Sequence, residues 1–222
     1  MQSVLGGLIK SYRLRQGLSQ SELLAAIGWH AHPSRLSRYE QGRVVPDRNT
    51  LEKLSSALGL RSDDRGRLLM EAGYVPTDEE VSAALQQLQP FMDAWKGPAY
   101  LTDFSWRFLG WNGPAAKIFG FPPDELERLP REKPRLLEFA FDSRWAVGRH
   151  IPEEILVPFG RGQIARFKAQ QRDRTRQRWY RQLLKRLMPI PLFRELWRTT
   201  PGELGSELMD YNRVQMDSPV GR

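Results

Sequence analysis

Hydrophobic residues in the first third of the chain recur at the three- and four-residue spacing of amphipathic helices. This spacing predicts five short helices between Leu5 and Gly73. Ser19 and Glu22 form a capping-box pattern, in which a serine oxygen accepts a hydrogen bond from the free amide three residues on. Glycine favours the left-handed conformation that stops a helix, and the predicted stops are Gly17, Gly28, Gly42 and Gly73. We therefore expect one compact all-helical domain over residues 1–76.

A single apolar stripe follows in residues 77–97. Thr77 and Glu80 repeat the capping-box pattern, and the stripe ends before Pro90. Its members are Val81, Ala84, Leu85 and Leu88. The stripe predicts a linker helix that packs either on its own domain or on the same helix of a second subunit. An outward stripe would favour a dimer.

The pattern changes again at Pro98, where a second domain over residues 98–222 is predicted. Residues 99–102 and 108–111 alternate like two strands of a hairpin. Asn112 is predicted to cap a helix that ends before Gly120. The chain is therefore of the α+β class, with an all-α domain followed by a mixed one.

Three further segments complete the second domain. Residues 122–134 are rich in proline and charge, which predicts a surface loop with at most a short helix. Residues 161–188 are predicted to form a long basic helix, and residues 207–211 resemble a strand. The basic segment carries ten Lys or Arg against one Asp. It predicts either an added surface for DNA or an acidic partner, or a solvated basic face.

Net charge narrows the class of partner. A formal charge of +8 favours a polyanion such as nucleic acid or an anionic membrane surface. The apolar runs are too short to span a bilayer, and the N-terminus has no apolar signal region. We expect a cytoplasmic protein without membrane insertion.

Metal and catalytic chemistry find little support in the sequence. The chain has no cysteine and only three histidines. His30 and His32 could be two metal ligands, but a third ligand is missing nearby, so we interpret this segment as a solvated turn. A nucleophile elbow, a phosphate-binding glycine loop and a pair of spaced carboxylates are all missing from the sequence. We therefore expect that the protein is not an enzyme and requires no cofactor. A sensor that binds haem or flavin is an alternative form of the same function, and a coloured purified protein would support it.

The third predicted helix, from about Ser34 to Gly42, has a polar and basic outward face. A short helix of this kind fits the major groove of DNA, where arginine can bind guanine through two hydrogen bonds. Arg38 is therefore the first candidate for reading a base.

Residues 18–23, residues 35–42 and Pro46 resemble the Cro/C1-type (XRE) helix-turn-helix family. The resemblance implies phosphate contacts at Ser19 and Gln20, with Gln20 also bracing the recognition helix. It further implies a buried ion pair between Arg13 and Glu40. The turn over residues 29–33 departs from the family by about two additional residues. The predicted DNA-binding residues are Ser19, Gln20, His32, Ser34, Arg35, Ser37, Arg38 and Arg43.

Residues 98–100, 109–112 and 193–197 resemble the ligand-binding domain of MmyB-type regulators. The resemblance implies a PAS-like fold and a lipophilic ligand such as a fatty acid. Aromatic side chains are the predicted pocket walls, although each is more often plain core. They are Tyr100, Trp111, Phe119, Phe139, Phe141, Trp145 and Trp179.

Together these features predict a transcription regulator that binds a double-stranded DNA operator as a homodimer and responds to a small lipophilic ligand. The alternative is a module that binds ligands or assembles partners without sequence-specific DNA binding. Salt-insensitive association and no duplex binding would favour that alternative.

Overall fold

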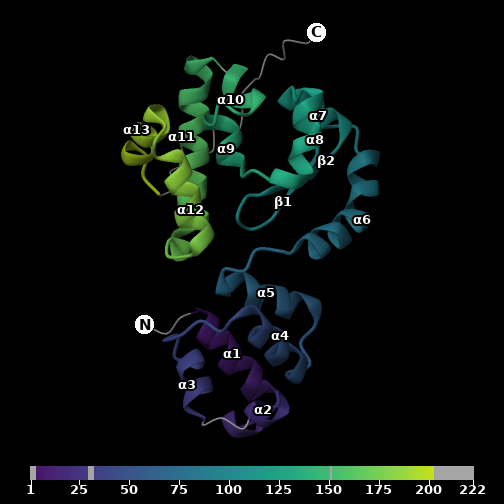
Figure 1. Ribbon diagram of the computed structural model, residues 1–222, viewed down its shortest axis with the longest axis vertical. Helices are drawn as coiled ribbons and strands as arrows, with labels where there is room; N and C mark the ends of the chain where they lie inside the picture. The colour runs from purple at the N-terminus through teal and green to yellow at the C-terminus, as the bar shows by residue number, and fades with distance from the viewer. Residues whose placement is uncertain (1–3, 30–32, 151, 203–222) are drawn as a thin grey trace. The chain divides into compact units, whose positions relative to one another are not determined.

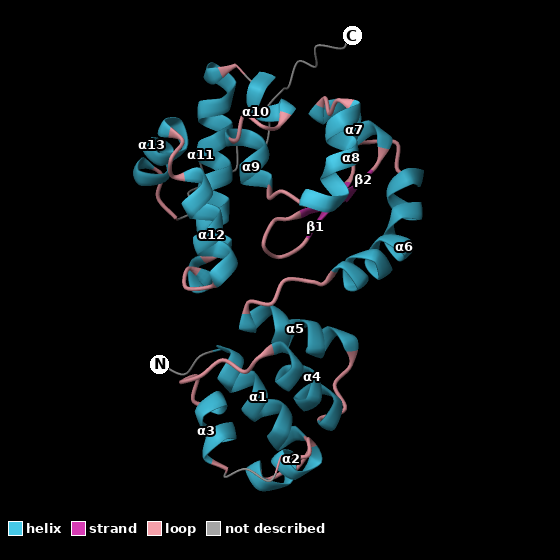
Figure 2. Ribbon diagram, viewed as in Figure 1, coloured by secondary structure: helices cyan, strands magenta, loops and turns pink. Residues whose placement is uncertain are grey.

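The computed structural model describes residues 4–29, 33–150 and 152–202, and the chain divides into two compact units, residues 1–75 and 76–222 (Figure 1). Helices dominate both units, and one small two-stranded sheet lies in the second (Figure 2). The predicted α+β class is confirmed. His30, His32 and the strand-like segment 207–211 lie outside the described residues.

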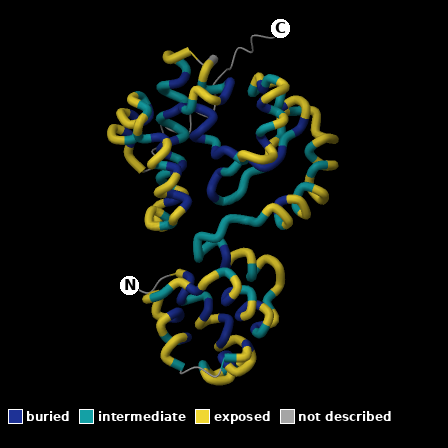
Figure 3. Tube along the Cα trace, in the orientation of Figure 1, coloured by how far each residue is buried: buried dark blue, intermediate teal, exposed yellow. Residues whose placement is uncertain are grey.

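The first unit contains the five predicted helices. They are α1 (Val4–Arg15), α2 (Gln20–Ala26), α3 (Ser34–Glu40), α4 (Arg48–Ala57) and α5 (Ser62–Ala72). Apolar side chains on their inner faces form one core, including the fully buried Ile9, Leu23, Leu36, Leu51, Leu54 and Leu68. Figure 3 shows these buried stretches alternating along each helix with exposed ones. This alternation is the amphipathic pattern that predicted the helices.

The helix ends of the first unit follow the predicted local signals. Ser19 Oγ accepts from the Glu22 amide, and the Glu22 carboxylate accepts from the Ser19 amide, which completes the capping box. Gly17, Gly28 and Gly42 have φ values of 69°, 74° and 70°, in the left-handed region that glycine tolerates best. Helix α4 begins at Arg48, where Asp47 caps it by accepting from the Thr50 amide.

The second unit contains the sheet and eight further helical segments among the described residues. The strands are β1 (Tyr100–Thr102) and β2 (Phe108–Trp111), which pair antiparallel as predicted. The helices are α6 (Asp78–Ala94), α7 (Gly113–Phe119), α8 (Pro123–Glu132), α9 (Leu136–Phe141), α10 (Ala146–His150), α11 (Glu153–Gln170), α12 (Arg178–Leu187) and α13 (Pro191–Thr199), with a single 3-10 turn, η1 (Arg172–Arg174), before α12. The PAS-like topology stays a prediction.

Helix α6 packs on the sheet of the second unit. The Leu85 side chain lies against the backbone of Gly110, and Gln89 donates to the Trp111 carbonyl at 2.9 Å. Beyond Pro90, the Met92 carbonyl accepts from Asn112 Nδ2 at 2.9 Å, so contacts hold the helix on both sides of the proline. The helix therefore continues through Pro90 to Ala94, because losing one backbone hydrogen bond does not stop a helix that the sheet supports.

Asn112 is confirmed as the cap of α7. Its Oδ1 accepts from the amides of Ala115 and Ala99, and its Nδ2 donates to the carbonyls of Met92 and Gly97. One buried side chain thus joins the end of α6, the start of β1 and the start of α7. Buried polar groups need such complete pairing.

Residues 122–134 form helix α8 for most of their length, so the predicted surface loop is wrong. Pro123 occupies the first turn, where proline fits because its missing amide would have no partner there. Pro130 lies in the last turn, and the buried Leu129 and Glu125 anchor the inner face.

The predicted long helix over residues 161–188 is interrupted. Helix α11 ends at Gln170, and α12 begins only at Arg178. The buried Gln171 side chain donates to the Phe104 carbonyl at 2.7 Å, which fixes the chain where it leaves α11. Tertiary contact therefore overrides a basic, helix-compatible sequence.

Candidate DNA-binding surface and candidate ligand domain

Glu40, the last residue of α3, joins three helices. Its carboxylate accepts from Arg13 Nε at 2.6 Å, from Arg13 Nη2 at 3.1 Å and from Gln20 Nε2 at 2.8 Å. Arg13 and Glu40 are 6% and 4% exposed, so the pair is shielded from water. The hydrogen bond to Glu40 raises the pKa of Arg13. The expected ion pair and the bracing role of Gln20 are confirmed, and they fix α3 against α1 and α2.

Arg38 and Arg43 present their side chains to solvent beside this fixed frame. Both residues are exposed. Within the described part of the chain, neither guanidinium has a hydrogen-bond partner or a counter-ion. The Arg43 amide donates to the Arg38 carbonyl at 2.9 Å, so the loop after α3 starts next to the helix. Two unengaged arginines with fixed backbones are suited to nucleic-acid contacts.

Arg35 and Ser37 are more restrained. The Arg35 guanidinium lies 4.2 Å from the centre of the Trp29 ring, and its Nε donates to the Tyr39 hydroxyl at 3.0 Å. Ser37 Oγ accepts from Gln41 Nε2 at 2.9 Å. These contacts orient both side chains before any partner arrives.

Ser19 and Ser34 begin α2 and α3. The Ser19 oxygen accepts from the Glu22 amide within the capping box, at the exposed start of α2. Hydrogen bonds from Ser19 lower the pKa of Glu22, so this carboxylate is charged beside Ser19 at neutral pH. Ser34 is exposed at the first residue of α3. Of the predicted DNA-binding residues, only His32 lies outside the described residues.

Five of the predicted pocket aromatics of the second unit lie in one cluster around the fully buried Phe108. Ring centres of four of them lie within 5.7 Å of the Phe108 ring, and Trp145 joins through Phe139 at 5.3 Å. The four are Tyr100, Trp111, Phe119 and Phe139. Their arrangement is that of a packed aromatic core.

The other two predicted aromatics belong to a second cluster. Phe141 contacts Phe193 edge to face at 5.1 Å. Trp179 contacts Phe104 at 5.9 Å and Phe167 at 6.3 Å. The second unit therefore holds two aromatic regions, one at the sheet and one among α11, α12 and α13.

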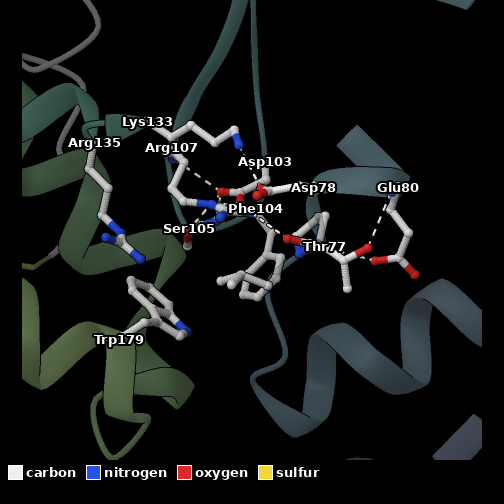
Figure 4. Close-up of polar contacts among 12 residues, drawn as sticks. Thr77, Asp78, Glu80, Asp103, Phe104, Ser105, Arg107, Lys133, Arg135 and Trp179 are labelled. Atoms are coloured by element: carbon white, nitrogen blue, oxygen red, sulfur yellow. Dashed lines mark hydrogen bonds and ion pairs between the residues drawn. The ribbon is translucent and has the colours of Figure 1, made fainter. Parts of the chain in front are cut away.

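A polar network at the hairpin loop, which Figure 4 shows, was not among the predicted sites. Asp103 accepts from Arg107 Nε at 2.7 Å and from the Ser105 amide at 2.8 Å. Arg107 also donates to the Pro76 carbonyl at 2.8 Å, and Lys133 pairs with Asp78 at 2.6 Å, which lowers the pKa of Asp78. The network ties the loop and the end of α8 to the segment that enters α6. Asp103 with Ser105 two residues later is a turn pattern from which this network could have been predicted.

Arg135, at the start of α9, was also not among the predicted site residues. It is 8% exposed, and its guanidinium carbon lies 5.1 Å from the centre of the Trp179 ring. Burial lowers the pKa of Arg135 to about 10. No local pattern indicates this burial, because an arginine that follows Pro130 and Pro134 in a charged segment is typical of an exposed loop.

Neither a metal centre nor a membrane span emerges within the described residues. In the described ranges, no three His, Asp or Glu side chains are grouped so that they could hold an ion. None of the helices described between residues 4 and 202 combines the length and apolar character that crossing a bilayer requires.

Two family models match the chain. The model described as a helix-turn-helix domain matches residues 4–68. The model described as the MmyB-like transcription regulator ligand binding domain matches residues 81–221, more than half of the chain. A search of curated proteins found no match.

Proposed function

Because the chain belongs to the family of regulators with an MmyB-like ligand-binding domain, here behind an XRE-like helix-turn-helix, we propose that it binds a specific operator and that a lipophilic ligand controls this binding. The two matched families together are those of a ligand-responsive transcription regulator. The proposal adds the residues, the chemistry of the ligand and the dimer.

The arrangement of α3 is the observation that carries DNA binding. Glu40 fixes the helix from its inner side, while Arg38 on the outer side is exposed and unengaged within the described structure. Because the backbone of α3 is held in place, less conformational entropy is lost when its arginine contacts a base. We assign base readout to Arg38 and backbone contacts to Ser19, Gln20 and Arg43.

Arg38→Ala is expected to reduce discrimination between the operator and random duplex by about 1 to 3 kcal/mol. A guanine that loses its two hydrogen bonds from arginine is no longer distinguished from other bases. Fluorescence anisotropy at physiological salt would measure both affinities, using an operator selected from a random duplex pool.

Arg67→Ala is the matched control, because Arg67 is equally exposed but lies on α5. It removes the same charge away from α2 and α3, so the discrimination should stay unchanged. Equal loss of affinity for all duplexes in Arg38→Ala would make Arg38 a phosphate contact. Failure of the unmodified protein to prefer any duplex would favour the alternative of a partner-assembly module.

The aromatic regions of the second unit support a lipophilic ligand. A compound such as a fatty acid would enter against these rings and shift the population of conformations that bind DNA. Native mass spectrometry of freshly purified protein, compared with its denatured spectrum, tests this directly. A bound mass of fatty-acid size supports the proposal, and a ligand without an apolar body contradicts it.

Helix α6 supports a homodimer. Leu88, Phe91 and Trp95 follow one another at helical spacing and are 41%, 76% and 64% exposed. Large apolar side chains grouped in this way are typical of an interaction surface. A second copy would place the same three side chains opposite them, as a two-fold dimer requires. The dimer would also pair two helix-turn-helix units for two half-sites.

Phe91→Ser is expected to weaken the dimer about tenfold or more, because a central aromatic side chain contributes strongly to such interfaces. Sedimentation equilibrium of the full chain would give the dissociation constant. Ile118→Ser is the control, since Ile118 is 45% exposed but lies on α7. If the unmodified protein is a monomer, or if both substitutions have an equal effect, the proposed role of Leu88, Phe91 and Trp95 in a dimer is contradicted.

A further inference from the structure

Arg135 is held in place by the backbone on both sides. The Phe108 amide donates to the Pro134 carbonyl at 2.8 Å, and the Leu136 amide donates to the Trp106 carbonyl at 3.0 Å. Residue 135 thus extends alongside β2 before α9 begins. Its side chain is directed into the second unit toward Trp179 (Figure 4).

The guanidinium of Arg135 lacks a hydrogen-bond acceptor. Its Nε is buried and unpartnered, and no side chain or carbonyl in the described part of the chain accepts from its other nitrogens. The Trp179 ring centre, 5.1 Å from the guanidinium carbon, gives a cation–π contact, but an indole nitrogen is a hydrogen-bond donor and not an acceptor. A buried cation without an acceptor is costly and rare.

The two nearest carboxylates are already engaged. Asp103 accepts from Arg107 Nε and from three groups of the hairpin loop, at 2.7 to 3.1 Å. Glu138 accepts from Arg186 Nε and from the backbone amide of Arg135, both at 2.8 Å. Each carboxylate therefore has its own arginine. Arg135 is the third cation of the group: both carboxylates attract it electrostatically, but neither accepts a hydrogen bond from its guanidinium in the described structure.

We propose that Arg135 anchors the carboxylate of an apolar small molecule, which rests on the lipophilic ligand proposed above. A carboxylate supplies one negative charge and two oxygens, which match one unpaired guanidinium edge. The apolar body of the ligand would lie against the aromatic cluster of Trp179, Phe104 and Phe167. A neutral lipid would leave the buried charge uncompensated.

Isothermal titration calorimetry of the full chain with decanoate and with 1-decanol tests the proposal. Arg135→Gln is expected to weaken decanoate binding about 10- to 100-fold, as loss of a charged hydrogen bond does, and to leave decanol binding within about twofold. Arg131→Gln is the matched control, because Arg131 is exposed on α8, and it should change neither affinity.

Equal decanoate binding by Arg135→Gln and the unmodified protein would overturn the anchor while leaving a lipophilic ligand in place. Failure of both probes to bind the unmodified protein would overturn the lipophilic ligand and the anchor together, without affecting DNA binding measured separately.

A second measurement separates a ligand anchor from a structural residue. Arg135→Met replaces an unpaired buried charge by an apolar side chain of similar length, so without added ligand the melting temperature is expected to rise by about 2 to 4 °C. Thermal unfolding followed by circular dichroism would show it. A fall of the same size would mean that the folded protein needs the charge of Arg135, and would overturn the proposal.

Discussion

Replacing Glu40 with alanine is expected to lower the free energy of unfolding of the first unit by about 3 to 5 kcal/mol. The substitution leaves Arg13 buried at 6% exposure with only the Leu18 carbonyl, at 2.7 Å, to accept from it. It also removes the acceptor of Gln20. Since small domains are stable by about 5 to 15 kcal/mol in total, the substitution removes a large fraction of the stability of the first unit.

Amide hydrogen exchange on the full chain is the suitable measurement, because it reports the stability of each unit separately. Protection in α1 and α3 should fall in Glu40→Ala, while protection in α11 and α12 should not change. The double variant Arg13→Met with Glu40→Leu should recover most of the loss, because apolar pairs often replace buried ion pairs at little cost. A double variant as unstable as the single one would show that packing, and not the unpaired charge, causes the loss.

The same variant connects stability with DNA binding. Glu40 belongs to α3, the helix that carries Arg38, so loss of the Arg13 contact frees the end of the proposed recognition helix. Affinity for every duplex should therefore fall, in contrast to the selective effect of Arg38→Ala. The comparison distinguishes a positioning residue from a residue that reads a base.

The first unit was predictable because its signals are local. Ser19 with Glu22 fixes the start of α2, and glycines with left-handed backbones end the helices. The ion pair was reached only through resemblance, because residues 13 and 40 are 27 positions apart and no local pattern connects them. Family resemblance therefore supplied the long-range contact that periodicity does not contain.

The second unit was less predictable because long-range contacts decide its elements. The proline-rich residues 122–134 were taken as a surface loop, yet they form α8, which is anchored by Glu125 through its pair with Arg149 at 2.9 Å. The burial of Arg135 had no local signal, since it comes from the hydrogen bonds that Pro134 and Leu136 form with residues 108 and 106 of the hairpin. Charge and proline content describe the average behaviour of a segment and not its neighbours.

Gly6→Ala is expected to destabilise the first unit by about 3 kcal/mol, although alanine is about 1 kcal/mol better than glycine within a helix. A Cβ at Gly6 would lie 2.8 Å from the Tyr39 carbonyl oxygen and would also overlap the carbonyl of Glu40. These are backbone atoms at the end of α3, so they cannot rotate away as a side chain could. The close contact between α1 and α3 requires glycine at this position.

Gly7→Ala provides the adjacent control. A Cβ at Gly7 meets no atom within 4 Å, so this variant should gain up to about 1 kcal/mol from helix propensity alone. Hydrogen exchange in α1 and α3 should thus shift in opposite directions for two neighbouring glycines of the same helix. If both substitutions stabilised the unit, α1 and α3 would have room for a methyl group between them. The position of the recognition helix would then depend on the Arg13 and Glu40 pair without support from the backbone contact.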